Sequence, residues 1–208
     1  MKQILFNTEM VRAILDDRKS QTRRPIDWDI SNNMDGDVAS GYSVQTDDGL
    51  IDALKLYKYQ SGDILYVRET FAKLNDEGHV YYEYKADTGD PYPGEWPQEE
   101  AKGNPDAPKW KSSRHMPKEA ARIFLKVTDI RMERVQDINP EDSIAEGLNV
   151  CCDCKEHGGC YLPNVCAYLP NTFKKVWNPI YKSKGYGWDT NCWVWIIEFE
   201  RCEKQDEN

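Results

Sequence analysis

Segments with the residue pattern of β-strands occur from one end of the chain to the other, and only short helical segments lie between them. The clearest strand patterns lie at residues 64–68, 121–135 and 193–199, each rich in β-branched or aromatic residues. The run at 193–199 is the most apolar, so we expect it at the centre of a sheet. This order favours an α+β fold, a small mixed β-barrel with short helices and two irregular insertions, over a doubly wound sheet.

Two of the expected helices have clear sequence signals. Asn139 followed by Pro140 is a typical helix start, and Gly147 is a typical residue for closing the same helix in the left-handed conformation. The apolar residues of 173–181 recur at the spacing of an amphipathic helix, and Pro179 is expected to end or kink that helix.

The chain has 208 residues, which is enough for one domain with insertions or for two small domains. We interpret it as a single domain over 1–208, with insertions at about 72–116 and 148–170. No apolar run approaches the roughly 18–20 residues of a membrane span, and the N-terminal residues lack the apolar stretch of a secretory signal. We therefore expect a soluble, intracellular protein with no membrane partner.

The formal net charge of −9 argues against non-specific nucleic-acid binding, because affinity for phosphates comes from clustered lysines and arginines. A role with nucleic acid therefore requires a local basic patch. Residues 11–24 contain one, made of Arg12, Arg18, Lys19, Arg23 and Arg24. The alternative interpretation of this run is an ordinary solvated surface.

Five of the seven cysteines lie between residues 151 and 166. Thiols stay reduced inside cells, so a metal site is the first hypothesis for such a cluster. The thiolates of Cys151, Cys154, Cys160 and Cys166 match a tetrahedral structural zinc site, and four thiolates leave no open position for catalysis. The alternative is a loop that carries reduced free thiols.

Residues 14–24, with the sequence ILDDRKSQTRR, resemble the N-terminal signature of ASCH domains, which belong to the PUA-like superfamily. The family pattern is the end of an apolar helix, a glycine turn and then K-x-x-T-x-R or K-x-x-E-x-R. Residues 62–71, 138–147 and 193–199 are similar to further blocks of the family, most of all in proteins encoded by phages and prophages. Asp17 stands where the family usually has glycine.

The resemblance implies a β-barrel with a cleft for RNA or for a modified nucleoside, in the cytoplasm of a bacterial host. Some small ASCH proteins hydrolyse the amide of N4-acetylcytidine. By this resemblance Lys19, Thr22 and Glu146 are the catalytic candidates, with Arg24 beside them. Other members of the family are ribonucleases, so the resemblance leaves binding, amide hydrolysis and RNA cleavage open.

The residue types are consistent with such chemistry. A threonine hydroxyl attacks a carbonyl only when a base takes its proton, and a lysine is that base only when burial or nearby cations lower its pKa. Glu146 can donate a proton to a leaving amine or orient Lys19, and Arg24 can hold a carbonyl or phosphate oxygen. The same groups can also grip a nucleotide without catalysis. For Thr22 and Glu146 the structural alternatives are a plain strand residue and a surface carboxylate.

Further substrate-binding candidates flank these positions or follow other predicted elements. They are Arg18, Arg23, Arg24, Arg68, Glu69 and Trp188. An aromatic ring can stack a base, worth about 1–3 kcal/mol, although ordinary core packing is the alternative for every tryptophan.

The sequence thus favours a protein that binds RNA or a modified nucleoside in a cleft. One alternative is a hydrolase, an amidohydrolase or a ribonuclease, that uses the same residues. Another is a phage protein that acts through protein–protein contacts. The first two hypotheses require the ammonium of Lys19 and the carboxyl group of Glu146 to meet, although the two residues lie far apart in the sequence.

Overall fold

The computed structural model describes residues 1–27, 34–37, 41–46, 49–52, 54, 57–90, 92–94, 98–104, 107–148 and 169–204, with the backbone alone at 34–37, 41–46, 49–52, 98–99 and 169–170. The chain divides into two compact units. Unit 1 consists of Met1–Asp16, Ile64–Lys126 and Arg201–Asn208, and unit 2 consists of Asp17–Asp63 and Val127–Glu200. The single domain expected over 1–208 stays a prediction.

The largest sheet has five strands in the order β1-β6-β9-β10-β2. Its strands are β1 (Lys2–Leu5), β2 (Gln21–Pro25), β6 (Ile64–Arg68), β9 (Phe124–Arg134) and β10 (Trp193–Cys202). β1 and β6 are parallel, whereas β6 pairs with β9 and β10 pairs with β2 in antiparallel register. The three strands expected from the clearest patterns are confirmed. The most apolar of them, β10, has a neighbour on each side, as predicted.

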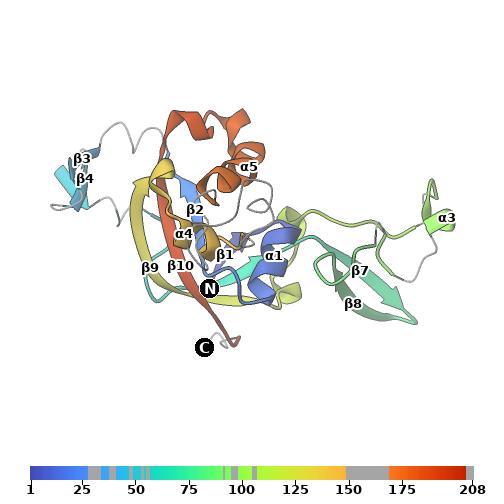
Figure 1. Ribbon diagram of the computed structural model, residues 1–208. Helices are drawn as coiled ribbons and strands as arrows, with labels where there is room; N and C mark the ends of the chain where they lie inside the picture. The colour runs from blue at the N-terminus through green and yellow to red at the C-terminus, as the bar shows by residue number, and fades with distance from the viewer. Residues whose placement is uncertain are drawn as a thin grey trace. The chain divides into compact units, whose positions relative to one another are not determined.

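Two smaller sheets accompany the large one. β3 (Met34–Asp37), β4 (Gly41–Thr46) and β5 (Gly49–Asp52) form one of them, and β7 (Phe71–Asp76) and β8 (His79–Tyr84) form the other, which is visible as a hairpin in Figure 1. The α+β class is confirmed, while no closed barrel is found among the described residues, so the barrel stays a prediction.

The helices are short, and the one after Asn139 begins and ends where the sequence indicates. They are α1 (Thr8–Leu15), α3 (Gln98–Ala101), α4 (Pro140–Ala145) and α5 (Leu169–Tyr181), with 3-10 turns η2 (Ser113–His115), η3 (Lys118–Ala120), η4 (Val135–Asp137), η6 (Lys182–Lys184) and η7 (Trp188–Thr190). The Asn139 side chain accepts a hydrogen bond from the amide of Asp142, and Gly147 follows α4 with φ 92°. Pro179 lies inside α5, which still continues to Tyr181.

Each unit has buried apolar clusters of its own. In unit 2, Phe173 and Trp177 of α5 pack with Val194 and Ile196 of β10. Figure 1 shows α4 beside β2 and close to α5, and α4 contacts both. In unit 1, Phe71 of β7 packs with residues of the η3 region. No helix among the described residues is long and apolar enough to cross a membrane.

Candidate functional site

Lys19 and Glu146 meet because the segment that precedes β2 pairs with the end of α4. Asp17 has a left-handed backbone, with φ 55°, at the position where the ASCH pattern has glycine. The Ser20 amide donates to the carbonyl of Ala145 over 2.9 Å, and Lys19 forms a β-bridge with Glu146. The meeting of the two residues that the sequence hypotheses required is therefore confirmed.

The Lys19 ammonium is enclosed, and all its hydrogens have acceptors. Nζ donates to the carboxylate of Glu146 at 2.7 Å, to the carbonyl of Glu146 at 2.8 Å and to the carbonyl of Gln21 at 2.7 Å. The side chains of Lys19 and Glu146 are 0% and 3% exposed. Burial lowers the pKa of Lys19, Glu146 opposes this change, and the charges of Arg24 and Arg23 add to it.

Arg23 extends this ion pair into a network, which we call the buried network. Its guanidinium lies 3.4 Å from the carboxylate of Glu146 and 2.9 Å from that of Asp142, and its side chain is 0% exposed. Glu133 lies 3.5 Å from the same guanidinium. Each carboxylate oxygen of Glu146 thus contacts one cation, so the buried charges compensate one another.

Thr22 and Arg24 lie on the other face of β2 from Arg23, because side chains alternate along a strand. Thr22 is 1% exposed and pairs in register with Ile197 of β10. Arg24 is half-buried, and its Nη1 donates to the hydroxyl of Tyr181 at 3.0 Å. Thr22 is therefore shielded from solvent, whereas Arg24 reaches an aromatic residue at the end of α5.

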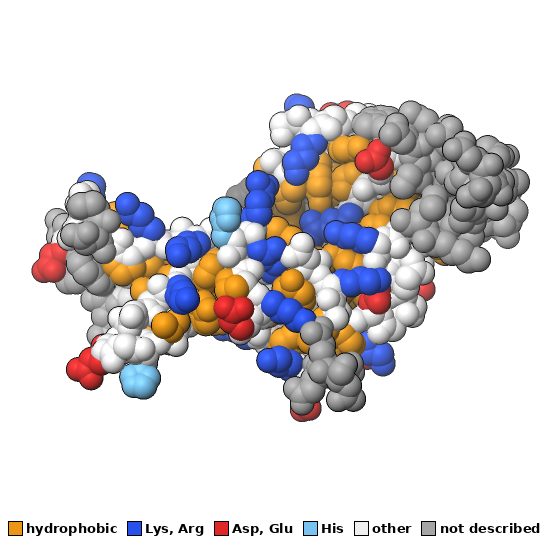
Figure 2. Space-filling view, turned by 180° about the vertical axis from the view of Figure 1, so that it is seen from behind, with side chains coloured by type: hydrophobic (Ala, Val, Ile, Leu, Met, Phe, Trp, Pro, Cys, Tyr) orange, Lys and Arg blue, Asp and Glu red, His pale blue; other side chains and the backbone are white. Residues whose placement is uncertain are grey.

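Tyr181 also lines a cavity of about 420 Å³ in unit 2, which we call the aromatic cavity. Its other aromatic lining residues are Tyr57, Tyr186 and Trp195. Tyr57 and Trp195 stack, with ring centroids 4.7 Å apart and ring planes 22° apart. Figure 2 shows a hollow of this kind, where hydrophobic side chains gather with Lys and Arg side chains. The volume lies in the range of roughly 300–1,000 Å³ that is usual for small-molecule sites.

Two tyrosine hydroxyls of the cavity residues differ in their bonding. The Tyr181 hydroxyl accepts from Arg24, as described above. The Tyr57 hydroxyl is buried and has no hydrogen-bond partner among the residues that the structure describes. Burial raises the pKa of Tyr57, so the hydroxyl keeps its proton and remains a donor. A buried donor without an acceptor is costly, so this hydroxyl lowers the stability of the cavity wall.

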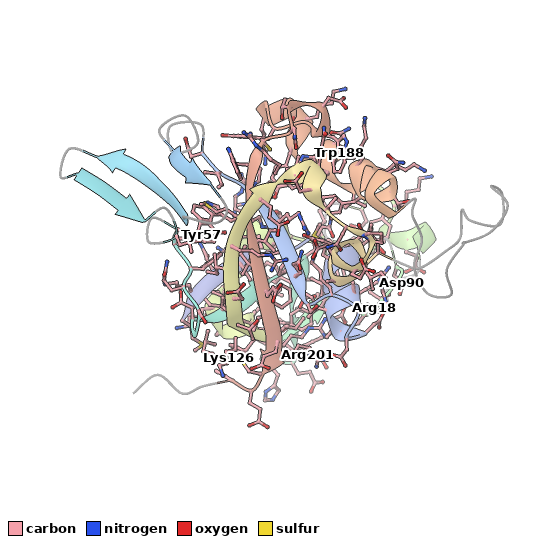
Figure 3. The ribbon with its side chains drawn as sticks, turned by 60° about the vertical axis from the view of Figure 1, so that its left-hand side comes forward. Arg18, Tyr57, Asp90, Lys126, Trp188 and Arg201 are labelled. Atoms are coloured by element: carbon pink, nitrogen blue, oxygen red, sulfur yellow. The ribbon has the colours of Figure 1, made fainter. Side chains whose placement is uncertain are left out.

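The other substrate-binding candidates of unit 2 have structural roles. Arg18 donates to the carbonyl of Gly147 at 2.9 Å, at the end of the segment that carries Glu146. Trp188 is 9% exposed and packs edge to face on Phe173 in the core. Figure 3 shows Trp188 well separated from Tyr57 of the aromatic cavity. Core packing, the alternative that the sequence left open for tryptophans, therefore describes this ring.

Arg68 and Glu69 belong to unit 1, and their side chains have partners there. Arg68 donates to the side chain of Gln3 and to the carbonyl of Arg114. Glu69 is 1% exposed, and both of its oxygens accept from Arg122, at 2.9 and 3.1 Å. Burial raises the pKa of Glu69, which Arg122 opposes. These contacts account for the Glu69 carboxylate and the Nη atoms of Arg68 without a ligand, whereas Nε of Arg68 is buried and has no hydrogen-bond partner among the described residues.

The predicted zinc ligands lie outside the described residues. Cys151, Cys154, Cys160 and Cys166 all fall in 149–168. Within the described ranges, no group of three or more His, Cys, Asp or Glu side chains has the arrangement of a metal site. The zinc hypothesis therefore stays a prediction.

Sequence reasoning missed the residues that line the aromatic cavity. Tyr57 and Lys58 lie outside every segment that the sequence predicted as a strand, a helix or a site. Tyr181 and Trp195 belong to a predicted helix and a predicted strand, but the pattern assigned them to packing. The signal available was the pairing of aromatic and basic residues in short windows, at Tyr57 with Lys58 and again from Tyr181 to Tyr186.

Comparisons with known proteins identified no similar protein. The chain matches no protein-family model, no curated protein and no solved structure. The functional argument therefore depends on the site itself.

Proposed function

We propose that this protein binds RNA or a modified nucleoside, with a base held in the aromatic cavity, and that it is a PUA-like β-barrel of the ASCH type. The observation that carries the proposal is the hydrogen bond from Arg24 to Tyr181. It links the K-x-x-T-x-R motif to a cavity of suitable size whose lining contains four aromatic residues. Base stacking on such rings contributes about 1–3 kcal/mol per base.

Exposure favours binding over catalysis at this site. Lys19, Thr22 and Glu146 are each less than 10% exposed, at 3%, 1% and 7%. All three hydrogens of the Lys19 ammonium are already donated within the chain. A substrate at these groups would have to displace internal contacts, whereas a ligand in the aromatic cavity need not. In this proposal the buried network holds β2 and α4 together, and the aromatic rings face the ligand. Arg24 lies behind them and is bonded to the Tyr181 hydroxyl.

The proposal is tested by titration of the protein with N4-acetylcytidine, with the four ribonucleosides and with a mixed RNA, followed by calorimetry. We expect saturable binding of at least one of these ligands. The Tyr186→Leu variant removes a stacking ring, so its binding free energy should be weaker by about 1–3 kcal/mol. Tyr81→Leu is the matched control, because Tyr81 is 43% exposed on β8 in unit 1. Absence of binding to every ligand would contradict the proposal.

Amide hydrolysis is a second candidate, favoured by the lowered pKa of Lys19 and its contact of 2.7 Å with Glu146. If it is correct, incubation with N4-acetylcytidine yields cytidine and acetate, and Thr22→Val abolishes turnover while the fold is kept. Product analysis by chromatography distinguishes the two functions. Binding without product supports the non-catalytic proposal.

We also propose a structural zinc ion bound by Cys151, Cys154, Cys160 and Cys166. The donor set is the support, because four thiolates suit a tetrahedral zinc site. Metal analysis of protein purified without a chelator should give about one zinc per chain. A value of zero ends this hypothesis and leaves the proposals for the cavity unchanged.

A further inference from the structure

The aromatic cavity carries an excess of positive charge. Lys58 and Lys184 line it, and Asp27 is the one acidic lining residue found in the described part of the chain. Arg24 lies close behind, bonded to the Tyr181 hydroxyl. The chain as a whole has a formal charge of −9, so this local excess runs against the average composition. A cation-rich hollow in an acidic protein attracts anions.

Neither lysine has a carboxylate partner among the described residues. Lys58 lies over the ring of Tyr59, with Nζ 4.6 Å from the centroid, and Lys184 lies over the ring of Tyr181 at 5.5 Å. A cation–π contact places the ammonium against the ring face, but it does not neutralise the charge or supply a hydrogen-bond acceptor. Both ammonium groups can therefore still donate to an anion.

The surroundings of Lys58 also carry an excess of positive charge. Burial lowers the pKa of Lys58, and the positive charge of Arg24 lowers it further. Like charges around one hollow repel each other, and a bound anion would relieve this repulsion. The buried network differs, because each of its cations contacts a carboxylate.

We propose that the ligand of the aromatic cavity is phosphorylated, with its base against the aromatic rings and a phosphate held by Lys58 and Lys184. This inference rests on the proposed function and narrows its substrate class from nucleosides to nucleotides. A phosphate offers several acceptor oxygens and at least one negative charge, which two unpaired ammonium groups match. The phosphate belongs either to a free nucleotide or to an RNA chain.

A second cavity of about 400 Å³, in unit 1, is a useful contrast. It also has tyrosines in its lining, but its charged lining residues are Glu83, Asp87, Asp90 and Arg122. Arg122 is already paired with Asp87 at 2.7 Å. Aromatic rings therefore occur in both cavities, and only the one in unit 2 combines them with unpaired lysines. The charge of the lining, rather than its aromatic content, assigns the phosphate to the aromatic cavity.

The test is calorimetric titration of the full chain with three probes. They are the four ribonucleosides, their 5′-monophosphates and a five-nucleotide RNA without terminal phosphates. We expect one or more monophosphates, or the RNA, to bind about tenfold tighter than the matching nucleosides, which is the effect of one or two charge-assisted contacts. Preference for the monophosphate identifies a terminal phosphate, and preference for the RNA identifies a backbone phosphate.

Two substitutions show whether the lysines make these contacts. Lys58→Gln and Lys184→Gln should each weaken binding of the phosphorylated ligand roughly threefold to tenfold more than they weaken binding of the matching nucleoside. Lys73→Gln is the matched control, because Lys73 is exposed on β7 and loses the same charge in unit 1. Thermal unfolding of each variant verifies that the fold is kept.

The outcomes separate this inference from the proposed function. If nucleosides bind as tightly as the phosphorylated probes, or if the lysine variants bind the phosphorylated probes like the wild type, the phosphate assignment is wrong and the proposed function stands. If none of the three probes binds, the phosphate assignment is wrong, and the proposed function is wrong as well if N4-acetylcytidine and the mixed RNA also fail to bind.

Discussion

The buried network and the aromatic cavity both belong to unit 2, and they treat charge in opposite ways. In the network, Lys19 and Arg23 are enclosed and contact the carboxylates of Glu146 and Asp142. In the cavity, Lys58 and Lys184 contact aromatic rings and have no carboxylate partner in the described part of the chain. Cations that contact carboxylates within the chain hold its strands and helices in place. Cations without such a partner are available to bind a ligand.

This difference changes how the K-x-x-T-x-R motif is understood. The resemblance to ASCH domains suggests that the whole motif acts on a substrate. The contacts divide it instead. Lys19 and Thr22 are closed off from solvent, and Arg24 connects β2 to a cavity residue. The comparison therefore predicts that substitutions in the network mainly reduce stability and that substitutions around the cavity mainly reduce affinity.

The largest expected effect is that of Glu146→Gln on stability. This change removes the carboxylate charge between two enclosed cations, and loss of one partner of a buried ion pair costs about 3–5 kcal/mol. The free energy of unfolding is measured by denaturation with urea. Glu141→Gln on the exposed side of α4 is the control and should cost about 1 kcal/mol or less. Equal losses in the two variants would show that the network does not hold β2 and α4 together.

A smaller effect is expected for Tyr181→Phe. It removes the hydroxyl that accepts from Arg24 but keeps the ring, and a hydrogen bond to a charged group contributes about 1.5–3 kcal/mol. The free energy of unfolding should decrease by this amount or less. Binding of the base should persist because the ring remains. Loss of all binding, with the fold kept, would mean that the hydroxyl rather than the ring recognises the ligand.

The smallest expected effect concerns alkaline pH. Burial raises the pKa of Tyr59 to about 12 from its ordinary value of 10.0. Above pH 10 the unfolded chain loses this proton before the folded chain does, so the contribution of Tyr59 to stability is lost as the pH rises toward 12. Between pH 10 and 11 this amounts to about 1 kcal/mol. In the Tyr59→Phe variant the free energy of unfolding, measured with urea, should fall correspondingly less between pH 10 and 11. The same fall with pH in the variant and the wild type would refute the assignment.

Local signals allowed part of the fold to be predicted. The helix after Asn139 and the turn at Asp17 depend on residues close in sequence, so local patterns predict them without knowledge of the fold. The strand β10 is likewise predictable because of its apolar run. The meeting of Lys19 and Glu146 followed only from the family resemblance, since no local rule joins residues so far apart.

The aromatic cavity was not predictable in the same way. Tyr57 lies in a polar stretch without periodicity, and it becomes a cavity residue only because Trp195 of β10 stacks on it. Tyr181 reaches the cavity because α5 continues past Pro179, where the sequence predicted an end or a kink. Trp188 was a candidate by residue type, yet its ring packs in the core. Long-range packing decided each of these cases.

The most direct test of the central claim is a crystal structure of the protein grown with the nucleotide or RNA that binds most tightly in solution. We predict density for a base among Tyr57, Tyr181 and Tyr186, with a phosphate against Lys58 and Lys184. Density for the ligand elsewhere on the molecule, or at the side chains of Lys19 and Glu146 after they have separated, would contradict the account.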